Sequence, residues 1–167
     1  MDYCIKEMSR NYAVDISNWT YEEPYNIYNG NKNDEFIQEL LDGSYYVVLG
    51  EESELVGFYC FGTAAQVPVG NQYGVYDDVS FIDIGLGMRP NFCGRGKGYN
   101  FLLKGLEFSR KRFLTKKLRL TVASFNKRAI RLYERIGFKK MEVFERKKLD
   151  ESMTFLVMEM SLKDGEL

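Results

Sequence analysis

Apolar positions in the first third of the chain alternate between strand-like runs and helical spacing. Residues 4–8 form a short run that predicts a first strand. Apolar residues three apart predict a short helix over 13–19, and a second helix is expected over 34–41, ending before Gly43. The chain therefore begins with a strand and two helices.

Two β-rich runs follow, over residues 45–49 and 55–61, separated by Gly-Glu-Glu-Ser-Glu. Such runs around a short polar turn predict an antiparallel hairpin. Residues 62–76 contain several glycines and no clear periodicity, so we expect a long loop there.

A further strand is expected over residues 79–88. Its even-numbered positions from 82 onward are aliphatic, whereas Asp83, Gly85 and Gly87 share the other face because side chains alternate along a strand. A carboxylate followed by two glycines predicts that this second face is open to a ligand.

The second half continues the alternation of strands and helices. Five elements are expected after a glycine-rich turn at residues 94–98. They are a helix to about residue 113, a strand over 118–122, a helix over 126–136 and strands over 138–144 and 153–160. No repeat, linker or low-complexity segment interrupts the chain. We therefore predict a single domain over residues 1–167, with a mixed sheet flanked by helices in an α+β fold of α/β-type three-layer organisation.

Composition narrows the chemistry. The chain has 167 residues, no histidine and three cysteines without CxxC spacing. The absence of histidine excludes Ser-His-Asp triads and HExxH metal sites, and the sequence predicts no metal site. No apolar run is long enough for a membrane span, so we expect a cytoplasmic protein with no membrane partner.

Charge is divided between the two halves of the chain. Residues 1–83 carry 3 Lys/Arg against 15 Asp/Glu, whereas residues 84–167 carry 20 against 9. This asymmetry indicates a cationic partner for the first half and an anionic partner for the second, although many of these charges also suit a solvated surface. The net charge of −1 does not favour nucleic acid as a partner.

The segment Cys93-Gly-Arg-Gly-Lys-Gly98 joins the strand over 79–88 to the following helix. A glycine-rich turn ahead of a helix presents free N–H groups to an anion, and Arg95 and Lys97 add positive charge. The segment fits neither the Walker A loop, since residue 91 is Asn, nor the dinucleotide fingerprint, since residue 99 is Tyr. A different phosphate or diphosphate site is predicted.

Two motifs resemble those of the GNAT superfamily of N-acetyltransferases. The cofactor motif, Gln/Arg-x-x-Gly-x-Gly/Ala after a proline, is similar to Pro90 followed by Cys93-Gly-Arg-Gly-Lys-Gly98, in which Cys93 departs from Gln/Arg. The second motif is similar to Asn126…Leu132-Tyr133…Gly137-Phe138. Together they match residues 79–160 well, and the front third is compatible in layout.

The resemblance implies a mixed, mostly antiparallel sheet that splays between its fourth and fifth strands and admits acetyl-CoA. The diphosphate would lie on the amides of the glycine loop, and the pantetheine arm would pair with the backbone of the preceding strand. The implied cofactor-binding residues are Gly87, Met88, Arg89, Cys93, Gly94, Arg95, Gly96, Lys97, Gly98, Asn126 and Tyr133. Lys127, Arg128 or Arg131 would reach the adenosine phosphates. The alternative is that these side chains are only solvated at the surface.

By the same resemblance, Tyr133 is the general acid for the CoA sulfur; a core tyrosine is the alternative. Asp83 is a candidate general base, since a partly buried carboxylate can take a proton directly or through water. A structural ion pair explains Asp83 equally well. Asp77, Asp78 and Glu22 are weaker candidates for the base.

The acceptor is expected to be a primary amine of a small molecule or peptide. Glu22, Tyr25 and Tyr28 lie in an acidic, aromatic segment that suits an amine pocket or the covered end of a core. Protein N-terminal acetylation of the ribosomal-protein alanine type is an alternative function, and a non-catalytic acyl-CoA-binding module is another. Homodimers are common in the family, so a homodimer is also considered.

Overall fold

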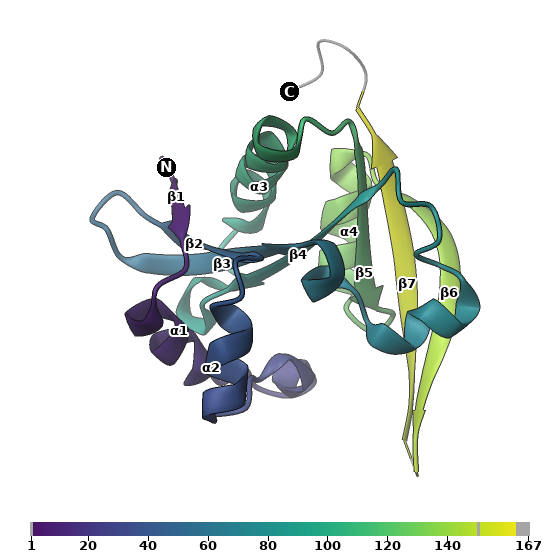
Figure 1. The fold of residues 1–167 in the computed structure, drawn as a ribbon, viewed down its shortest axis with the longest axis horizontal. Helices are drawn as coiled ribbons and strands as arrows, with labels where there is room; N and C mark the ends of the chain where they lie inside the picture. The colour runs from purple at the N-terminus through teal and green to yellow at the C-terminus, as the bar shows by residue number, and fades with distance from the viewer. Residues whose placement is uncertain (1, 150, 163–167) are drawn as a thin grey trace. The chain divides into compact units, whose positions relative to one another are not determined.

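The structure is a computed structural model that describes residues 2–149 and 151–162. Figure 1 shows its elements in chain order. The strands are β1 (Cys4–Glu7), β2 (Tyr45–Leu49), β3 (Leu55–Phe61), β4 (Ile82–Met88), β5 (Lys117–Ala123), β6 (Lys139–Lys148) and β7 (Glu151–Ser161). The α-helices are α1 (Arg10–Ser17), α2 (Asp34–Leu40), α3 (Gly98–Phe113) and α4 (Lys127–Ile136). Short 3-10 helices are η1 (Tyr25–Tyr28), η2 (Gly62–Ala65), η3 (Pro68–Tyr73) and η4 (Pro90–Phe92).

The strands follow the order β1-β2-β3-β4-β5-β7-β6. The pairs β1–β2, β2–β3, β5–β7 and β6–β7 are antiparallel, whereas β4 and β5 are parallel. The register between β4 and β5 contains only Ile82↔Leu118 and Asp83↔Arg119, although each strand has seven residues. The predicted mixed, mostly antiparallel sheet is confirmed, and its parallel contact ends after Asp83.

The chain forms two compact units, which are not continuous in sequence. The first unit is Met1–Cys60 with Leu86–Leu102, and the second is Phe61–Gly85 with Leu103–Leu167. Strand β4 and helix α3 therefore contribute residues to both units. One domain over residues 1–167 stays a prediction.

The first unit is built on the β2–β3 hairpin, in which every residue of β2 is buried. Helices α1 and α2 lie side by side on one face of this hairpin (Figure 1). Helix α2 begins where the Asn33 side chain accepts a hydrogen bond from the Phe36 amide at 2.9 Å. Asp34 and Glu35 in its first turn suit the positive end of the helix dipole.

Glycine is required in this unit where β3 and β4 approach each other. A Cβ at Gly57 would collide with the Gly87 carbonyl and the Phe101 ring, and a Cβ at Gly87 would collide with the Phe58 ring. The prediction of an open face is therefore wrong at Gly87, because an aromatic side chain from the neighbouring strand fills the space that the missing side chain leaves.

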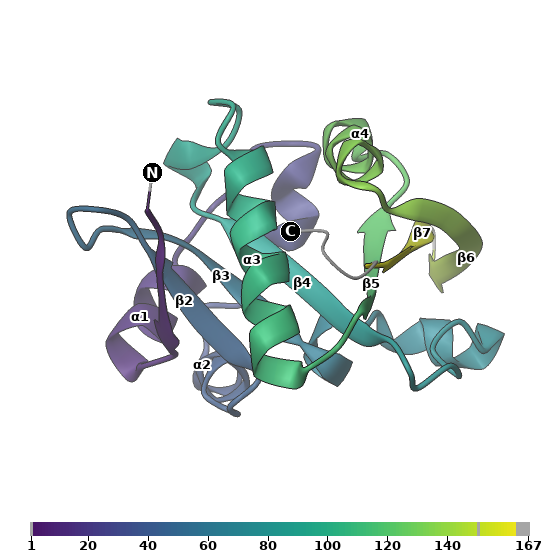
Figure 2. The same cartoon turned by 90° about the horizontal axis from the view of Figure 1, so that it is seen from above.

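The second unit packs β5, β7 and β6 between two layers. Helix α4 lies on one face of these strands, and the segment containing η2 and η3 lies against the other (Figures 1 and 2). A core of six buried residues joins that segment to the strands, namely Val75, Tyr76, Ala123, Phe144, Phe155 and Val157. The rings of Phe144 and Phe155 stack with centroids 5.5 Å apart.

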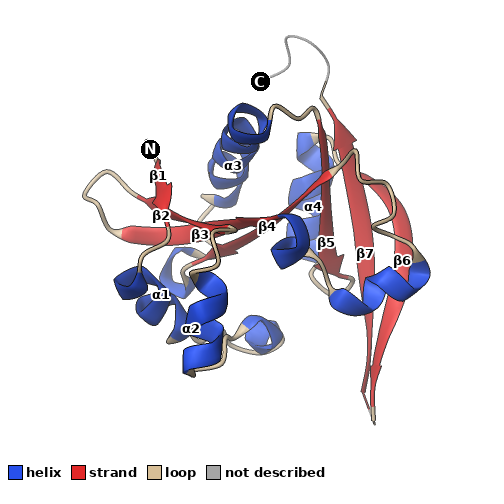
Figure 3. Cartoon of the chain, viewed as in Figure 1, coloured by secondary structure: helices blue, strands red, loops and turns tan. Residues whose placement is uncertain are grey.

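Three segments differ from the sequence-based expectation. Strand β4 begins at Ile82 rather than residue 79, because the Asp78 side chain accepts a hydrogen bond from the Ser80 amide at 2.9 Å and holds a turn. The expected loop over 62–76 contains η2 and η3. The final hairpin is longer than expected, since cross-strand pairing continues to Lys148↔Glu151 (Figure 3).

Candidate active site

The glycine loop of the first unit has the geometry of an anion cradle. Gly94 and Gly96 have φ values of 74° and 72°, which place both in the left-handed region that glycine adopts without strain. Helix α3 begins at Gly98. Among the described residues, no acceptor engages the backbone amides of residues 94–97, and a Cβ at Gly96 would meet no atom within 4 Å. The loop thus offers exposed donors at the positive end of a helix, which fits a diphosphate.

The side chains of the glycine loop stabilise its conformation and also give it positive charge. The Lys97 ammonium lies 4.5 Å from the centroid of the Phe92 ring, and Arg95 is exposed. The Cys93 thiol donates to the carbonyls of Met88 and Arg89 at 3.4 and 3.6 Å. Cys93 therefore connects the loop to the end of β4.

The end of β4 presents backbone groups on the edge that does not face β3. The Arg89 amide donates to the Val56 carbonyl of β3 at 2.8 Å. Because backbone groups alternate in direction along a strand, the Met88 amide and carbonyl point the other way. The Met88 carbonyl accepts a hydrogen bond from the Tyr21 hydroxyl at 2.8 Å.

The Arg89 side chain is held by α1. Its Nη2 lies 3.5 Å from Asp15 Oδ1, which also accepts the Trp19 indole N–H at 3.0 Å. This arrangement fixes Trp19, whose ring centroid is 6.1 Å from that of Phe58. Among the predicted cofactor-binding residues, Arg89 is thus tied by its side chain to the helical layer of the first unit.

Asp83 lies in the second unit and is 3% exposed. Arg119 donates to both of its oxygens, from Nε to Oδ1 at 2.7 Å and from Nη2 to Oδ2 at 2.8 Å. Gln66 donates to Oδ2 at 2.9 Å. Both oxygens of this carboxylate are already engaged by donors, so the geometry favours the ion-paired alternative over the general base.

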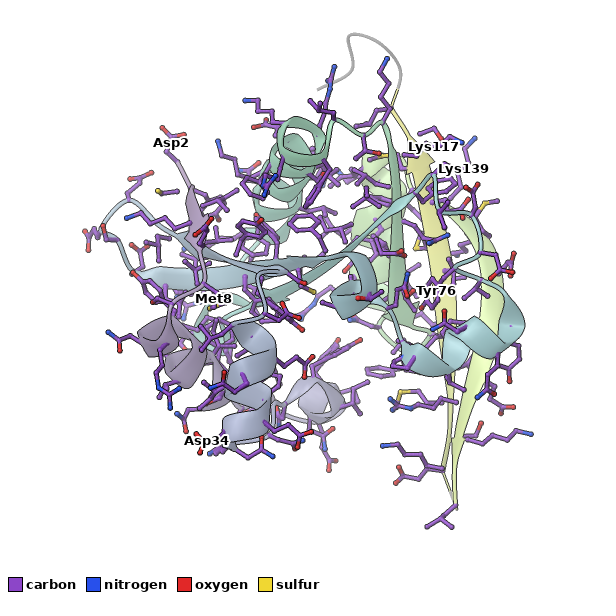
Figure 4. The ribbon with its side chains drawn as sticks, viewed as in Figure 1. Asp2, Met8, Asp34, Tyr76, Lys117 and Lys139 are labelled. Atoms are coloured by element: carbon purple, nitrogen blue, oxygen red, sulfur yellow. The ribbon has the colours of Figure 1, made fainter. Side chains whose placement is uncertain are left out.

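The environment of Arg119 explains why it tolerates burial. Its guanidinium also donates to the Asp78 carbonyl at 3.2 Å and lies over the rings of Tyr76 and Phe81. Burial lowers the pKa of Arg119, but the hydrogen bonds and charge of Asp83 outweigh it, and the net pKa is raised. Tyr76, labelled in Figure 4, shares a hydrogen bond of 2.8 Å with Thr121 of β5. This cluster anchors the segment around residues 66–81 to β5.

Tyr133 and Asn126 lie on α4 and at its N-terminus, also in the second unit. Tyr133 is 8% exposed, and its ring meets Phe138 edge-on with centroids 6.2 Å apart. Asn126 Oδ1 accepts the Ala129 amide at 3.2 Å and caps the helix. Lys127, Arg128 and Arg131 are exposed on this helix.

The remaining candidates are divided between the units. In the first unit, Glu22 is exposed, Tyr25 is half-buried at the start of η1, and Tyr28 is 42% exposed. Tyr21, which precedes them, was missed by the sequence analysis, because its partner Met88 is 67 residues away. In the second unit, Asp77 and Asp78 are exposed.

Hydrogen bonds from the side chain and amide of Ser80 lower the pKa of Asp78. Asp78 therefore stays a carboxylate that binds protons weakly, which makes it a poor general base.

Over residues 2–149 and 151–162, no cluster of three or more His, Cys, Asp or Glu side chains is arranged to hold a metal ion. Over the same residues, no helix combines the length and apolar character needed to cross a membrane.

Comparison with known proteins places these features in a family. Several solved acetyltransferase structures share the fold at low sequence identity. A spermidine N-acetyltransferase chimera of SpeG from Vibrio cholerae and hSSAT has a TM-score of 0.73 and 18% identity over 96% of each chain. A dodecameric spermidine N-acetyltransferase from Vibrio cholerae has a TM-score of 0.67 and 19% identity, covering 95% of this chain and 93% of that one. A candidate phosphinothricin N-acetyltransferase has a TM-score of 0.71 and 14% identity, covering 98% of this chain and 100% of that one.

No curated protein matches the chain. The model of the acetyltransferase (GNAT) family matches residues 11–138, which include the glycine loop and the helix that carries Tyr133. The chain belongs to the acetyltransferase (GNAT) family.

Proposed function

We propose that this chain is an acetyl-CoA-dependent N-acetyltransferase that acetylates a primary amine of a small molecule or peptide. Family membership supports acetyl transfer. The observation that carries the proposal is the glycine loop, whose amides over residues 94–97 have no acceptor among the described residues at the start of α3. Donors of this kind suit the diphosphate of coenzyme A.

The chain's own residues would hold the cofactor in two ways. The amides of Gly94 to Gly98 and the exposed Arg95 would bind the diphosphate, with Lys97 beside them. The Met88 amide, which points away from β3, would bind the extended arm, with Gly87 and Arg89 flanking it in the strand. Cys93 would act by bracing the loop, and Asn126 by starting the helix that carries Tyr133. Acetyl-CoA supplies an acetyl group activated as a thioester.

The transfer forms a C–N bond to the acceptor amine and breaks the C–S bond. The nitrogen loses one proton and the sulfur gains one, so the products are an acetamide and free CoA. Tyr133 is proposed to give the proton to the sulfur, because a phenol donates without prior ionisation. The proton from nitrogen would leave to water. Asp83 is proposed to act as the structural partner of Arg119.

The acceptor is proposed to be cationic before it is deprotonated for attack. The first unit, which carries Glu22, Tyr25 and Tyr28, contains most of the acidic front half of the chain. Structural relatives are named for spermidine and phosphinothricin acetylation, so both compounds belong in a test panel. A peptide with a free N-terminal alanine tests the alternative of protein N-terminal acetylation.

The experiment combines calorimetry with acetyl-CoA and CoA release across this amine panel. Wild-type protein should bind acetyl-CoA and release CoA with at least one amine. Tyr133→Phe should keep acetyl-CoA affinity but lose about 100-fold or more in kcat, the scale of general acid catalysis. Tyr12→Phe on α1 is the matched control and should leave both unchanged.

Each other result has a definite meaning. Binding without CoA release from any amine would favour a non-catalytic acyl-CoA-binding module. Unchanged turnover in Tyr133→Phe would remove Tyr133 from the mechanism. Absence of acetyl-CoA binding would contradict the proposed function. A homodimer stays a prediction, which sedimentation velocity tests directly.

A further inference from the structure

The Tyr21 hydroxyl has a fixed direction of hydrogen bonding. It lies 2.8 Å from the Met88 carbonyl oxygen, which can only accept. The phenol proton must therefore point at Met88, and the lone pairs of the phenol oxygen point elsewhere. Over the described residues, no donor engages that oxygen. The hydroxyl consequently retains the capacity to accept a hydrogen bond.

The position of Tyr21 is held from several sides within the first unit. Its backbone amide donates to Asn29 Oδ1 at 2.7 Å, which closes the segment that contains η1. Just before it, Trp19 is buried and hydrogen-bonded to Asp15. Tyr21 itself is half-buried. These contacts order the residue before any ligand arrives, which reduces the entropic cost of using it for binding.

Tyr21 also stays protonated at the pH where amines react. Burial raises the pKa of its phenol well above the ordinary value, and the nearby Cys93 thiol raises it further. A neutral phenol oxygen accepts a hydrogen bond from an N–H group but does not remove its proton. The residue thus has the properties of a positioning group rather than of a base.

We propose that Tyr21 positions the acceptor amine, its phenol oxygen accepting a hydrogen bond from an N–H of the attacking nitrogen. The inference rests on the proposed function and adds that the acetyl thioester, at the end of the bound arm, lies within reach of the Tyr21 hydroxyl at the outward edge of β4. With one N–H directed to Tyr21, the nitrogen lone pair is free to face the acetyl carbonyl. Tyr21 is then a determinant of amine binding that precedes the predicted candidates Glu22 and Tyr25 in the same segment.

The test is steady-state kinetics of Tyr21→Phe, using spermidine, phosphinothricin and an N-terminal alanine peptide as acceptors. We expect kcat/KM for the amine to fall about tenfold, mainly through KM, the effect of one lost hydrogen bond. The calorimetric affinity for acetyl-CoA should stay within about twofold. The pH profile of kcat/KM should keep its midpoints, because a positioning group does not take up the proton.

Asn29 provides a second, independent perturbation. Asn29→Ala removes the acceptor that holds the Tyr21 amide and should raise the amine KM in the same direction by a smaller factor. Asn29→Asp keeps an oxygen that can accept from the Tyr21 amide and should therefore leave the amine KM at the wild-type value. Tyr12→Phe is again the control for loss of a phenol from the first unit.

The outcomes separate this inference from the function on which it rests. Wild-type turnover with an unchanged amine KM in Tyr21→Phe would overturn the inference alone. An equal loss of acetyl-CoA affinity in Tyr21→Phe would also overturn it, because the hydroxyl would then support the fold of the site. Absence of wild-type turnover with all three amines would remove the proposed function and this inference together.

Discussion

The glycine loop and the Asp83–Arg119 pair are both polar centres next to β4, but they differ in how fully their groups are engaged. Asp83 and Arg119 are 3% and 1% exposed, and each oxygen of Asp83 accepts a hydrogen bond. The loop amides over residues 94–97 are unengaged among the described residues, and Gly94 and Gly96 are exposed. Satisfied groups hold a fold together, whereas unsatisfied groups at a surface are available to a ligand.

A charged residue near a site can serve either the stability of the fold or the binding of a ligand. Asp83 has a residue type and strand position that suit catalysis, yet both of its oxygens accept hydrogen bonds from Arg119 and Gln66. The loop is proposed to act through backbone groups, which no composition count reveals. Stability should therefore depend most on the ion pair, and ligand affinity most on the loop.

The largest effect on stability is expected from breaking the ion pair. Asp83→Ala leaves the Arg119 charge buried without its partner, which should lower the free energy of unfolding by about 3–5 kcal/mol. Urea unfolding measures this change. Asp77→Asn removes an exposed carboxylate in the same unit and should change stability by less than about 0.5 kcal/mol. A small loss in Asp83→Ala would show that the pair is not a structural centre.

The largest effect on ligand affinity is expected from the loop. Gly96→Ala places a methyl group in the open space beside the amides and should weaken acetyl-CoA binding by about tenfold or more. Its positive φ also makes alanine cost about 1–2 kcal/mol of stability. Gly43→Ala is the matched control, since Gly43 has a φ of 94° and no neighbour within 4 Å of a Cβ. It should cost the same stability with unchanged affinity.

If Gly96→Ala and Gly43→Ala had the same acetyl-CoA affinity, the unengaged amides of the glycine loop would not be the site that binds acetyl-CoA. Isothermal calorimetry on both variants gives this result directly, and their unfolding midpoints show whether the backbone cost is matched.

A smaller effect on stability is expected at alkaline pH, from one buried phenol in each unit. Burial raises the pKa of Tyr21 in the first unit and of Tyr76 in the second. The folded state therefore keeps these phenols neutral, while the unfolded chain ionises near pH 10. Their contribution to stability is complete below about pH 10 and is lost as pH rises through the folded pKa. Urea midpoints should fall between about pH 9.5 and 11.

Tyr21→Phe should flatten this alkaline decline, because phenylalanine has no proton to lose in either state. A midpoint that rises with pH in the wild type would have the wrong sign for raised phenol pKa values. Tyrosinate absorbance measured in parallel should show a fraction of the 12 tyrosines titrating late.

The smallest effect is expected from Cys93. Its thiol donates to two backbone carbonyls rather than standing over the loop, so it adds little to anion binding. Cys93→Ser keeps a donor of similar size and should change acetyl-CoA affinity by less than about threefold, within the range of a single weak hydrogen bond. A larger loss would assign the thiol a direct part in cofactor binding.

Much of the fold could be predicted because its signals are local. The β2–β3 hairpin follows from two β-rich runs and a polar turn, and α4 follows from its apolar spacing, Asn126 and Gly137. The glycine loop could be predicted for the same reason, since its glycines, proline and following helix are adjacent in sequence.

What could not be predicted depends on partners far away in the chain. Arg119 is 36 residues from Asp83, so the engagement of that carboxylate has no sequence signature. Phe58 fills the space beside Gly87 from a neighbouring strand, which made the expected open face wrong there. Tyr21 meets Met88 across 67 residues. Local patterns thus indicated the backbone that is proposed to face the ligand, but not the side chains that surround it.

The most direct test of the central claim is a titration of acetyl-CoA followed by two-dimensional amide NMR. If the loop grips the diphosphate, the amide resonances of Gly94 to Gly98 should shift saturably, and by more than those of Gly43 or the β6–β7 hairpin. Saturable acetyl-CoA binding that leaves the resonances of residues 94–98 in place would contradict the account.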